Sequence, residues 1–183
     1  MMKKFMILCM SFLMTVTLAA CGKKDDVKEY ASTNEVLETV INGEELDFPF
    51  MGGGTLNMKD NAPETVDLKD EFFISSFGIK EDMVDKVKEM SSMTHGMNQN
   101  IFNGAAVKLN DGEDVSSYLE TLKENFLGSQ WMCGAPEVFY VLDLGNNYFV
   151  TFYGAEEVAA PLKDKALAQL TGSKLVIDEK ITE

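Results

Sequence analysis

The sequence predicts an α+β domain in which helices cover one face of an antiparallel sheet. Three observations lead to this prediction. Residues 101–183 contain six segments whose patterns follow the order β-α-β-β-α-β. The two central strands are separated only by Asn146 and Asn147, which tolerate the left-handed conformation of a tight hairpin turn. Both helical stretches are followed by a glycine, Gly128 and Gly172, as expected where a helix stops.

The elements of this sheet core follow from local patterns. After the first apolar run, which is the predicted strand 101–109, apolar side chains recur at i, i+3, i+4, i+7 and i+11, and this spacing predicts an amphipathic helix. Pro161 is expected near the first turn of the second helix. We expect the four strands to form one antiparallel sheet with both helices on the same face, the split-βαβ or ferredoxin-like arrangement. The predicted strands are 101–109, 138–144, 147–153 and 174–181, and the predicted helices are 113–127 and 160–171.

Residues 33–100 are expected to be a mainly helical N-terminal part of the same single domain, 33–183. Ser32 and Glu35 have the capping-box spacing of a helix start, and Gly43 is a stop signal. A loop is expected over 43–66, which contains three consecutive glycines and two prolines. Two more helices are predicted after it, one over 67–77 capped by Asp67 and one that begins near Lys80 and continues through the methionine-rich stretch that follows.

Both faces of the predicted hairpin 138–153 are apolar, so each face needs a cover. The two core helices account for one face only. For the other face three covers remain open: the N-terminal helices, a second copy of the chain in a homodimer, or a ligand.

The first twenty residues have the form of an export signal. Lys3 and Lys4 precede an uncharged apolar run too short to span a bilayer comfortably. The run ends in Leu18-Ala19-Ala20-Cys21, which resembles the lipobox of bacterial lipoproteins, in which the cysteine receives a diacylglycerol thioether and becomes the first residue. Residues 1–20 are therefore expected to be a lipoprotein signal peptide, Cys21 the lipidation site, and 21–32 a polar tether. The alternatives are a plain signal peptide or an N-terminal membrane anchor.

Charge narrows the classes of partner. The chain has 30 acidic residues against 16 lysines and no arginine, a net charge of −14. This excludes a basic surface for nucleic acid and bidentate arginine contacts to phosphate. Anionic headgroups would repel such a surface. We therefore expect contact with the membrane through lipid on Cys21, on the extracytoplasmic side of the cell membrane.

The stretch "MSSMTHGM" brings three methionines close to the only histidine. Thioethers beside an imidazole can bind Cu(I), so Met90, Met93, His95 and Met97 form the one candidate metal site. The alternative is that methionines at helical spacing pack in the core, with His95 near a helix end. We favour the core, with Met83, Val87 and Met90 buried, and expect no metal and no cofactor.

Other motifs indicate structure rather than chemistry. Cys133 has no intrachain partner once Cys21 is lipidated, and it is expected to be a small buried apolar residue rather than a nucleophile. The acidic run 110–114 lacks the ligand spacing of a calcium loop and suits a helix N-cap. The glycines of 51–55 lack the Lys-Ser/Thr of a phosphate-binding loop. No pair of carboxylates stands out as catalytic.

Three stretches, "FGIKEDMVDKVKEMSSM", "AAVKLNDGEDVSSYLETLKENF" and "APEVFYVLDLGNNYFVTF", resemble the 4358-type domain-of-unknown-function family. These are small lipoproteins of Gram-positive, clostridia-like bacteria, and the resemblance covers roughly residues 33–153. The loop 43–66 departs from the compact pattern of that family. The resemblance implies an α+β lipoprotein domain and carries over no catalytic residue.

We therefore expect a membrane-anchored, non-enzymatic module that binds an envelope protein or a small ligand. One alternative is an extracytoplasmic copper-handling protein that uses the Met/His cluster. A weaker alternative is an envelope hydrolase whose acidic residues cannot be assigned from the sequence.

Overall fold

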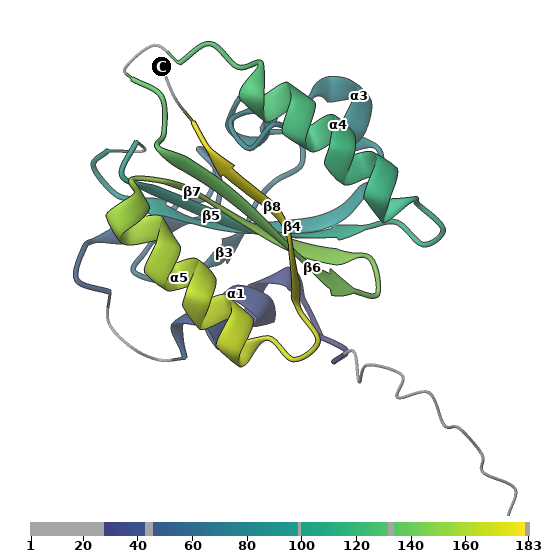
Figure 1. Ribbon diagram of the computed structural model, residues 1–183, viewed down its shortest axis with the longest axis horizontal. Helices are drawn as coiled ribbons and strands as arrows, with labels where there is room; N and C mark the ends of the chain where they lie inside the picture. The colour runs from purple at the N-terminus through teal and green to yellow at the C-terminus, as the bar shows by residue number, and fades with distance from the viewer. Residues whose placement is uncertain (1–27, 43–45, 99, 132–133, 182–183) are drawn as a thin grey trace, which may run out of the picture.

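The computed structural model describes residues 28–42, 46–98, 100–131 and 134–181, and in them an antiparallel sheet of eight strands is flanked by five helices (Figure 1). The α+β prediction is confirmed. The strands are β1 (Phe50–Gly52), β2 (Lys59–Asp60), β3 (Glu64–Thr65), β4 (Val87–His95), β5 (Phe102–Leu109), β6 (Val138–Gly145), β7 (Tyr148–Gly154) and β8 (Lys174–Lys180). The helices are α1 (Thr33–Ile41), α2 (Glu71–Ser75), α3 (Glu81–Val84), α4 (Val115–Leu127) and α5 (Glu156–Gln169).

The six predicted elements of the sheet core are all present, with small shifts at their ends. Asn146 and Asn147 make the β6–β7 turn with φ of 50° and 64°, as their residue types predict. Asp114 caps α4 by accepting a hydrogen bond from the Ser117 amide at 3.2 Å. Helix α5 begins earlier than predicted, at Glu156, so Pro161 lies inside the helix and not in its first turn.

The order of the strands is β2-β1-β4-β5-β7-β6-β8, with β3 beside β1 on the same edge of β4, and every neighbouring pair is antiparallel. A ferredoxin-like sheet would place β8 beside β5. Here β4 occupies that edge of β5, and β8 pairs with β6 instead. The ferredoxin-like strand order is therefore not confirmed.

The two core helices lie on opposite faces of the sheet, so the prediction of one shared face is wrong (Figure 1). Crossovers between parallel strands are right-handed almost without exception. The β5–α4–β6 and β7–α5–β8 connections step across the sheet in the same direction, but they start from strands that run in opposite directions. Two right-handed crossovers of this kind put their helices on opposite faces. Because β4 already pairs with the other edge of β5, β8 cannot pair there, and the second crossover cannot return across the sheet toward β5.

Side chains of alternate residues therefore fill two separate cores. Val141 and Phe149 face α4, whereas Val150 and Leu142 face α5. The rings of Phe126 and Phe139 stack at 3.9 Å in the first core. Helices α2 and α3 close that core beside α4, and α1 closes the other beside α5. Both apolar faces are thus covered from within the chain, which removes the observation that suggested a homodimer.

The helix predicted from Lys80 is wrong beyond its first turn. Helix α3 has four residues, and the following segment is β4, which lies inside the sheet between β5 on one side and β1 and β3 on the other. A strand buried on both faces shows no apolar–polar alternation. Methionines seven residues apart then imitate a helical repeat. Residues 33–100 are consequently less helical than expected.

The first helix is confirmed, and the segment after it is corrected. Ser32 caps α1, and Asn42, at φ 48°, takes the left-handed position at its end. The stop signal Gly43 lies outside the described residues. The predicted loop 43–66 contains β1, β2 and β3 in its described part. The helix predicted over 67–77 shortens to α2, which Asp70 caps in place of Asp67.

Candidate functional site

The two ends of the sheet carry different surfaces. At one end, β5 finishes at Leu109 beside the β6–β7 turn, and the N-terminal segment of the described chain, residues 28–33, lies across the sheet. At the other end, β4 finishes at His95 beside β1. The two ends differ in chemistry, the first being polar and the second apolar.

The N-terminal segment rests on three polar side chains that are in register across β4, β5 and β7. Glu89 pairs with Lys108, and Lys108 pairs with Tyr148, so the three side chains point to the same face. We call this set, Glu89, Lys108 and Tyr148, the junction row.

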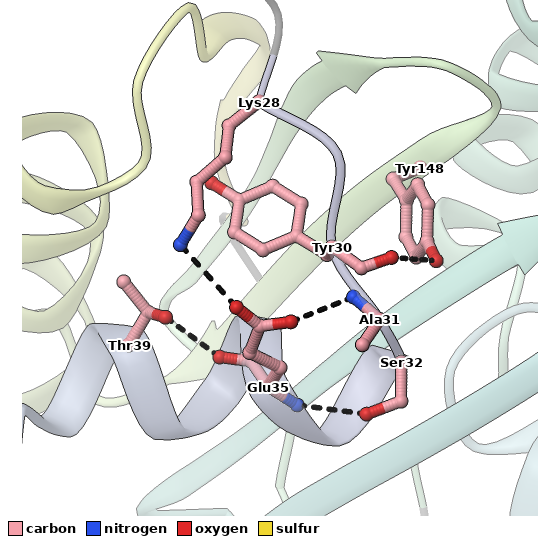
Figure 2. A network of polar contacts seen from close by, with 7 residues as sticks. All are labelled: Lys28, Tyr30, Ala31, Ser32, Glu35, Thr39 and Tyr148. Atoms are coloured by element: carbon pink, nitrogen blue, oxygen red, sulfur yellow. Dashed lines mark hydrogen bonds and ion pairs between the residues drawn. The ribbon is translucent and has the colours of Figure 1, made fainter.

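Both ends of the junction row bind the N-terminal segment. The Tyr148 hydroxyl donates to the carbonyl of Tyr30 at 3.0 Å (Figure 2). The Glu89 carboxylate accepts from the backbone N–H and the hydroxyl of Thr33, at 3.0 and 2.9 Å. In the middle, the Lys108 ammonium donates to the Tyr148 hydroxyl at 3.1 Å. This hydrogen bond is the main reason why the pKa of Lys108 is raised, so the lysine stays charged.

A second set of contacts fixes the segment to the start of α1 (Figure 2). The Glu35 carboxylate accepts from the Ala31 amide at 2.6 Å and lies 3.4 Å from the Lys28 ammonium. The Ser32 hydroxyl accepts from the Glu35 amide at 3.2 Å. The hydrogen bond from the Ala31 amide is the main reason why the pKa of Glu35 is lowered; burial opposes this effect, and the Lys28 ion pair adds to it. This is a capping box in which the glutamate reaches one residue further back than usual.

Tyr30 is 5% exposed, so residues expected to be tether already belong to the folded domain. Its ring meets that of Tyr148 edge-on, with centroids 6.0 Å apart. In Figure 2 the Tyr30 hydroxyl points away from Tyr148, and it has no hydrogen-bond partner within the described part of the chain. Burial raises the pKa of this hydroxyl. The boundary of the domain therefore lies before Tyr30, and not at residue 33.

A polar cavity of about 370 Å³ opens beside the segment. Charges of both signs border it, and its only described cation is the lysine of the junction row. Its lining residues are Glu29, Tyr30, Lys108, Asp111, Asn146, Asn147 and Tyr148.

At the opposite end, the structure separates the four candidate copper ligands. Met90 packs in the core beneath α4, and Met93 in the core beneath α1 and α5, both 0% exposed, because residues three apart on a strand point to opposite faces. Met97 is 86% exposed beyond the strand. His95 is the last residue of β4, which corrects its expected place near a helix end.

The imidazole of His95 has a structural role. Its ring stacks on Phe48 with centroids 5.4 Å apart, and Nδ1 accepts hydrogen bonds from the amides of Met97 and Asn98. An Nδ1 that accepts leaves the proton of a neutral imidazole on Nε2, so neither nitrogen offers a free lone pair. The burial expected for Met83, Val87 and Met90 is confirmed, with 2%, 5% and 0% exposed.

Next to His95 is a second cavity, of about 330 Å³, whose lining combines apolar side chains with two threonines and the histidine. Two of its lining residues, Met58 and Met97, are exposed by 60% and 86%. Leu56 and Phe72, which adjoin the lining residues Thr55 and Phe73 in the sequence, are exposed by 68% and 86%. We call these four the distal apolar surface: Leu56, Met58, Phe72 and Met97. The residues that line the cavity itself are Met51, Gly53, Thr55, Met58, Phe73, Thr94, His95, Gly96 and Met97.

The glycine-rich loop supports this surface by binding a carboxylate of the same chain. Asp70, 6% exposed, accepts from the amide and the hydroxyl of Thr55, both at 2.6 Å, and from the Phe73 amide at 3.3 Å. A Cβ at Gly54 would lie 2.6 Å from the Asp70 carboxylate, which explains why that position has no side chain. Burial raises the pKa of Asp70, but the hydrogen bonds outweigh it and leave the pKa below its usual value.

The remaining candidates are the two cysteines of the expected mature chain, metal clusters and membrane-spanning helices. Cys21 and Cys133 lie outside the described residues. In the described ranges, no group of three or more His, Cys, Asp or Glu side chains is arranged to hold a metal ion. None of the helices in those ranges combines the length and the hydrophobicity needed to cross a bilayer.

The sequence prediction missed the junction row. A lysine inside an otherwise apolar strand, in "GAAVKL", could have indicated a buried polar contact. Its partners could not be identified, because they lie on other strands whose distance from this lysine along the sequence follows no rule. Comparison of the chain with family models, curated proteins and solved structures finds no match.

Proposed function

We propose that this chain is a lipid-anchored protein of the extracytoplasmic side of the cell membrane, and that its α+β domain is a non-enzymatic module that binds an envelope partner. The observation that carries the proposal is Leu18-Ala19-Ala20-Cys21 directly after an uncharged apolar run. The resemblance to the 4358-type lipoprotein family is part of this proposal.

The charge of the chain and the energy of acyl-chain burial support an anchor made of lipid. Loss of residues 1–20 would leave 14 lysines against 30 acidic residues, a net charge of about −16, which anionic headgroups repel. Each buried methylene contributes about 0.8 kcal/mol, so two acyl chains can hold the protein without help from its surface.

The junction row limits how far the domain can lie from the bilayer. Tyr30 is fastened to the sheet by Tyr148, and Lys28 pairs with Glu35. Only seven chain steps separate Cys21 from Lys28, which span at most about 25 Å. The end of the sheet with the junction row would then face the membrane, and the distal apolar surface would face away from it.

The test is replacement of Cys21 by Ala, with Cys9→Ala as the matched control inside the expected signal peptide. Cys21→Ala should shift the protein out of the membrane fraction or leave it unprocessed, whereas Cys9→Ala should behave like the wild type. Intact-mass measurement should find a diacylglyceryl cysteine at the N-terminus of the wild type. A mature N-terminus at another residue, with no acyl group, would refute the proposal.

The alternative functions have less support. Copper handling by the Met/His cluster needs soft ligands that converge, and the structure places Met90 and Met93 on opposite faces of the sheet. A hydrolase needs an activated nucleophile or a pair of carboxylates in a cleft. Among the described residues that line the cavities at the ends of the sheet, Glu29 and Asp111 are the only carboxylates, and no other observation assigns them a catalytic role.

A further inference from the structure

We infer that the distal apolar surface is the docking site for a basic segment of an envelope protein that presents one or two large apolar side chains. The inference rests on the proposed function, because the lipid anchor decides which end of the sheet is free. It names the class of partner that the proposed binding module would take.

The first observation is that four exposed apolar side chains either line one cavity or adjoin its lining residues in the sequence. Seven large apolar side chains are exposed among the described residues, and four of them form the distal apolar surface. They come from three separate segments: the loop after β1, helix α2 and the loop after β4. Phe72 and Met97 are each 86% exposed, although solvation of such groups is unfavourable. Exposed apolar side chains that cluster mark interaction sites more often than ones that are scattered.

The second observation is that the surface is held in shape. The amide of Thr55 and the amide of Phe73 bind the same carboxylate, that of Asp70. Their sequence neighbours Leu56 and Phe72 are therefore attached close to one fixed point. Ser92 of β4 donates to the carbonyl of Gly53 at 2.8 Å and ties the loop to the sheet. The exposed side chains thus stand on a well-connected base, which lowers the entropic cost of binding.

The third observation concerns the shape and composition of the cavity. Its volume of about 330 Å³ is at the lower limit of small binding pockets and suits one or two large side chains of a partner. Three of its lining residues are methionines, Met51, Met58 and Met97. Unbranched, polarizable thioethers adapt to differently shaped apolar groups, and such surfaces are common in proteins that bind amphipathic segments.

The fourth observation is charge, which decides between partners. Residues 53–72 contain five acidic residues and two lysines. Asp70 is buried and Lys59 pairs with Glu64 at 3.4 Å, which leaves three exposed acidic residues, Asp60, Asp67 and Glu71, against one lysine. Glu71 lies next to Phe72 and is exposed. An anionic bilayer or a second copy of this acidic chain would be repelled, whereas a segment with lysine or arginine beside its apolar side chains would be attracted.

The position in the fold agrees with a protein partner. Along β5, the cavity lies near Asn103, the partner of Thr94, and the junction row lies at Lys108. Five residues of strand separate them, about 17 Å. The distal apolar surface is therefore at the end away from the anchored segment, where a partner in the envelope can reach it.

The experiment uses the purified full-length chain in detergent micelles and two model peptides, one of leucine and lysine in an amphipathic helical pattern and one with every lysine replaced by glutamate. Binding is measured by calorimetry for the wild type, for Phe72→Ser/Met97→Ser, and for the control Leu167→Ser/Val176→Ser. The control changes two exposed apolar residues of α5 and β8. All four positions are at least 36% exposed, so both variants should fold, which circular dichroism verifies.

We expect the lysine peptide to bind the wild type saturably and to bind the control variant with the same affinity. It should bind Phe72→Ser/Met97→Ser at least tenfold more weakly. The glutamate peptide should bind the wild type at least tenfold more weakly than the lysine peptide does. Equal affinity of both variants, or no saturable binding up to about 1 mM, would overturn it. So would self-association of the wild type that Phe72→Ser/Met97→Ser abolishes, or equally patch-dependent binding to anionic vesicles. Because Cys21 is unchanged in all these proteins, failure here is distinct from failure of the lipidation test.

Discussion

Replacement of Asp70 by Asn tests the claim that a carboxylate organises the glycine-rich loop. One oxygen of Asp70, Oδ2, accepts from the amide and the hydroxyl of Thr55, and the other, Oδ1, accepts from the Phe73 amide. Asparagine has one acceptor oxygen, so in either orientation its NH₂ group faces an N–H donor. A hydrogen bond to a charged group contributes about 1.5–3 kcal/mol, and a buried donor left unpaired costs more. We expect Asp70→Asn to lower the free energy of unfolding by about 2 kcal/mol.

The matched control is Asp67→Asn, which makes the same change of charge at an exposed residue three positions earlier. Within the described residues, the Asp67 carboxylate accepts a hydrogen bond from the Lys69 amide, at 3.0 Å. We expect a loss of at most about 0.5 kcal/mol, as for other surface substitutions. Urea unfolding followed by circular dichroism measures both variants. Equal losses for Asp67→Asn and Asp70→Asn would refute the structural role of the Asp70 carboxylate.

The pH dependence provides a second, independent readout. The pKa of Asp70 is lower in the folded chain than its ordinary value of 3.8. A group with a depressed pKa stabilises the fold fully above its unfolded pKa, and this contribution is lost as the pH falls through its folded pKa. The difference in stability between the wild type and Asp70→Asn should therefore be largest near neutral pH and should shrink below about pH 4. A difference that stays constant down to about pH 2 would contradict this assignment.

Three further predictions concern other parts of the fold. Tyr148→Phe should cost about 1 kcal/mol and speed hydrogen exchange of the N-terminal segment, whereas Tyr118→Phe should cost nothing, because the buried Tyr118 hydroxyl has no partner in the described residues. Met90→Ala should cost about 2–4 kcal/mol in urea unfolding, and Met97→Ala less than about 0.5, since their exposures are 0% and 86%. Pro161→Ala should raise the melting temperature and stabilise by about 1–2 kcal/mol, because it restores an amide donor inside α5; a lower melting temperature would show that the proline fits there.

The accuracy of the sequence prediction depends on the range of the interactions that decide each feature. The turn at Asn146 and Asn147, the cap at Asp114 and the apolar spacing of α4 are local, and the structure has all three where the sequence predicts them. The face on which α5 lies is not local. It depends on which edge of the sheet is free for β8, and β4, far away in the sequence, decides this by pairing with β5. No pattern within α5 carries that information.

Strand β4, which the sequence predicts as helix, was also misassigned because distant residues decide its structure. Ser91, Ser92 and Thr94 are buried, so β4 lacks the polar face that would mark a strand by alternation. Their hydroxyls are satisfied by residues distant in sequence; Ser91, for example, lies 2.8 Å from the Thr33 hydroxyl. A row of small polar residues is stable in the centre of a sheet only when neighbouring segments supply hydrogen-bond partners for its hydroxyls. The junction row was missed for the same reason, because its three members meet only through the register of three strands.

The register that hides the junction row from sequence inspection also gives the two ends of the domain different contacts. A single face of β4, β5 and β7 binds the N-terminal segment through Glu89 and Tyr148, so a force on that segment is transmitted into the centre of the sheet and not to a loose edge. At the far end of the same strands, the Asp70 carboxylate holds a loop whose exposed apolar side chains have no cover within the described chain. Both ends depend on one continuous sheet, so the distal apolar surface is held at a fixed distance from the N-terminal segment. In our proposal, a protein that joins a membrane to a partner needs that property more than it needs a catalytic centre.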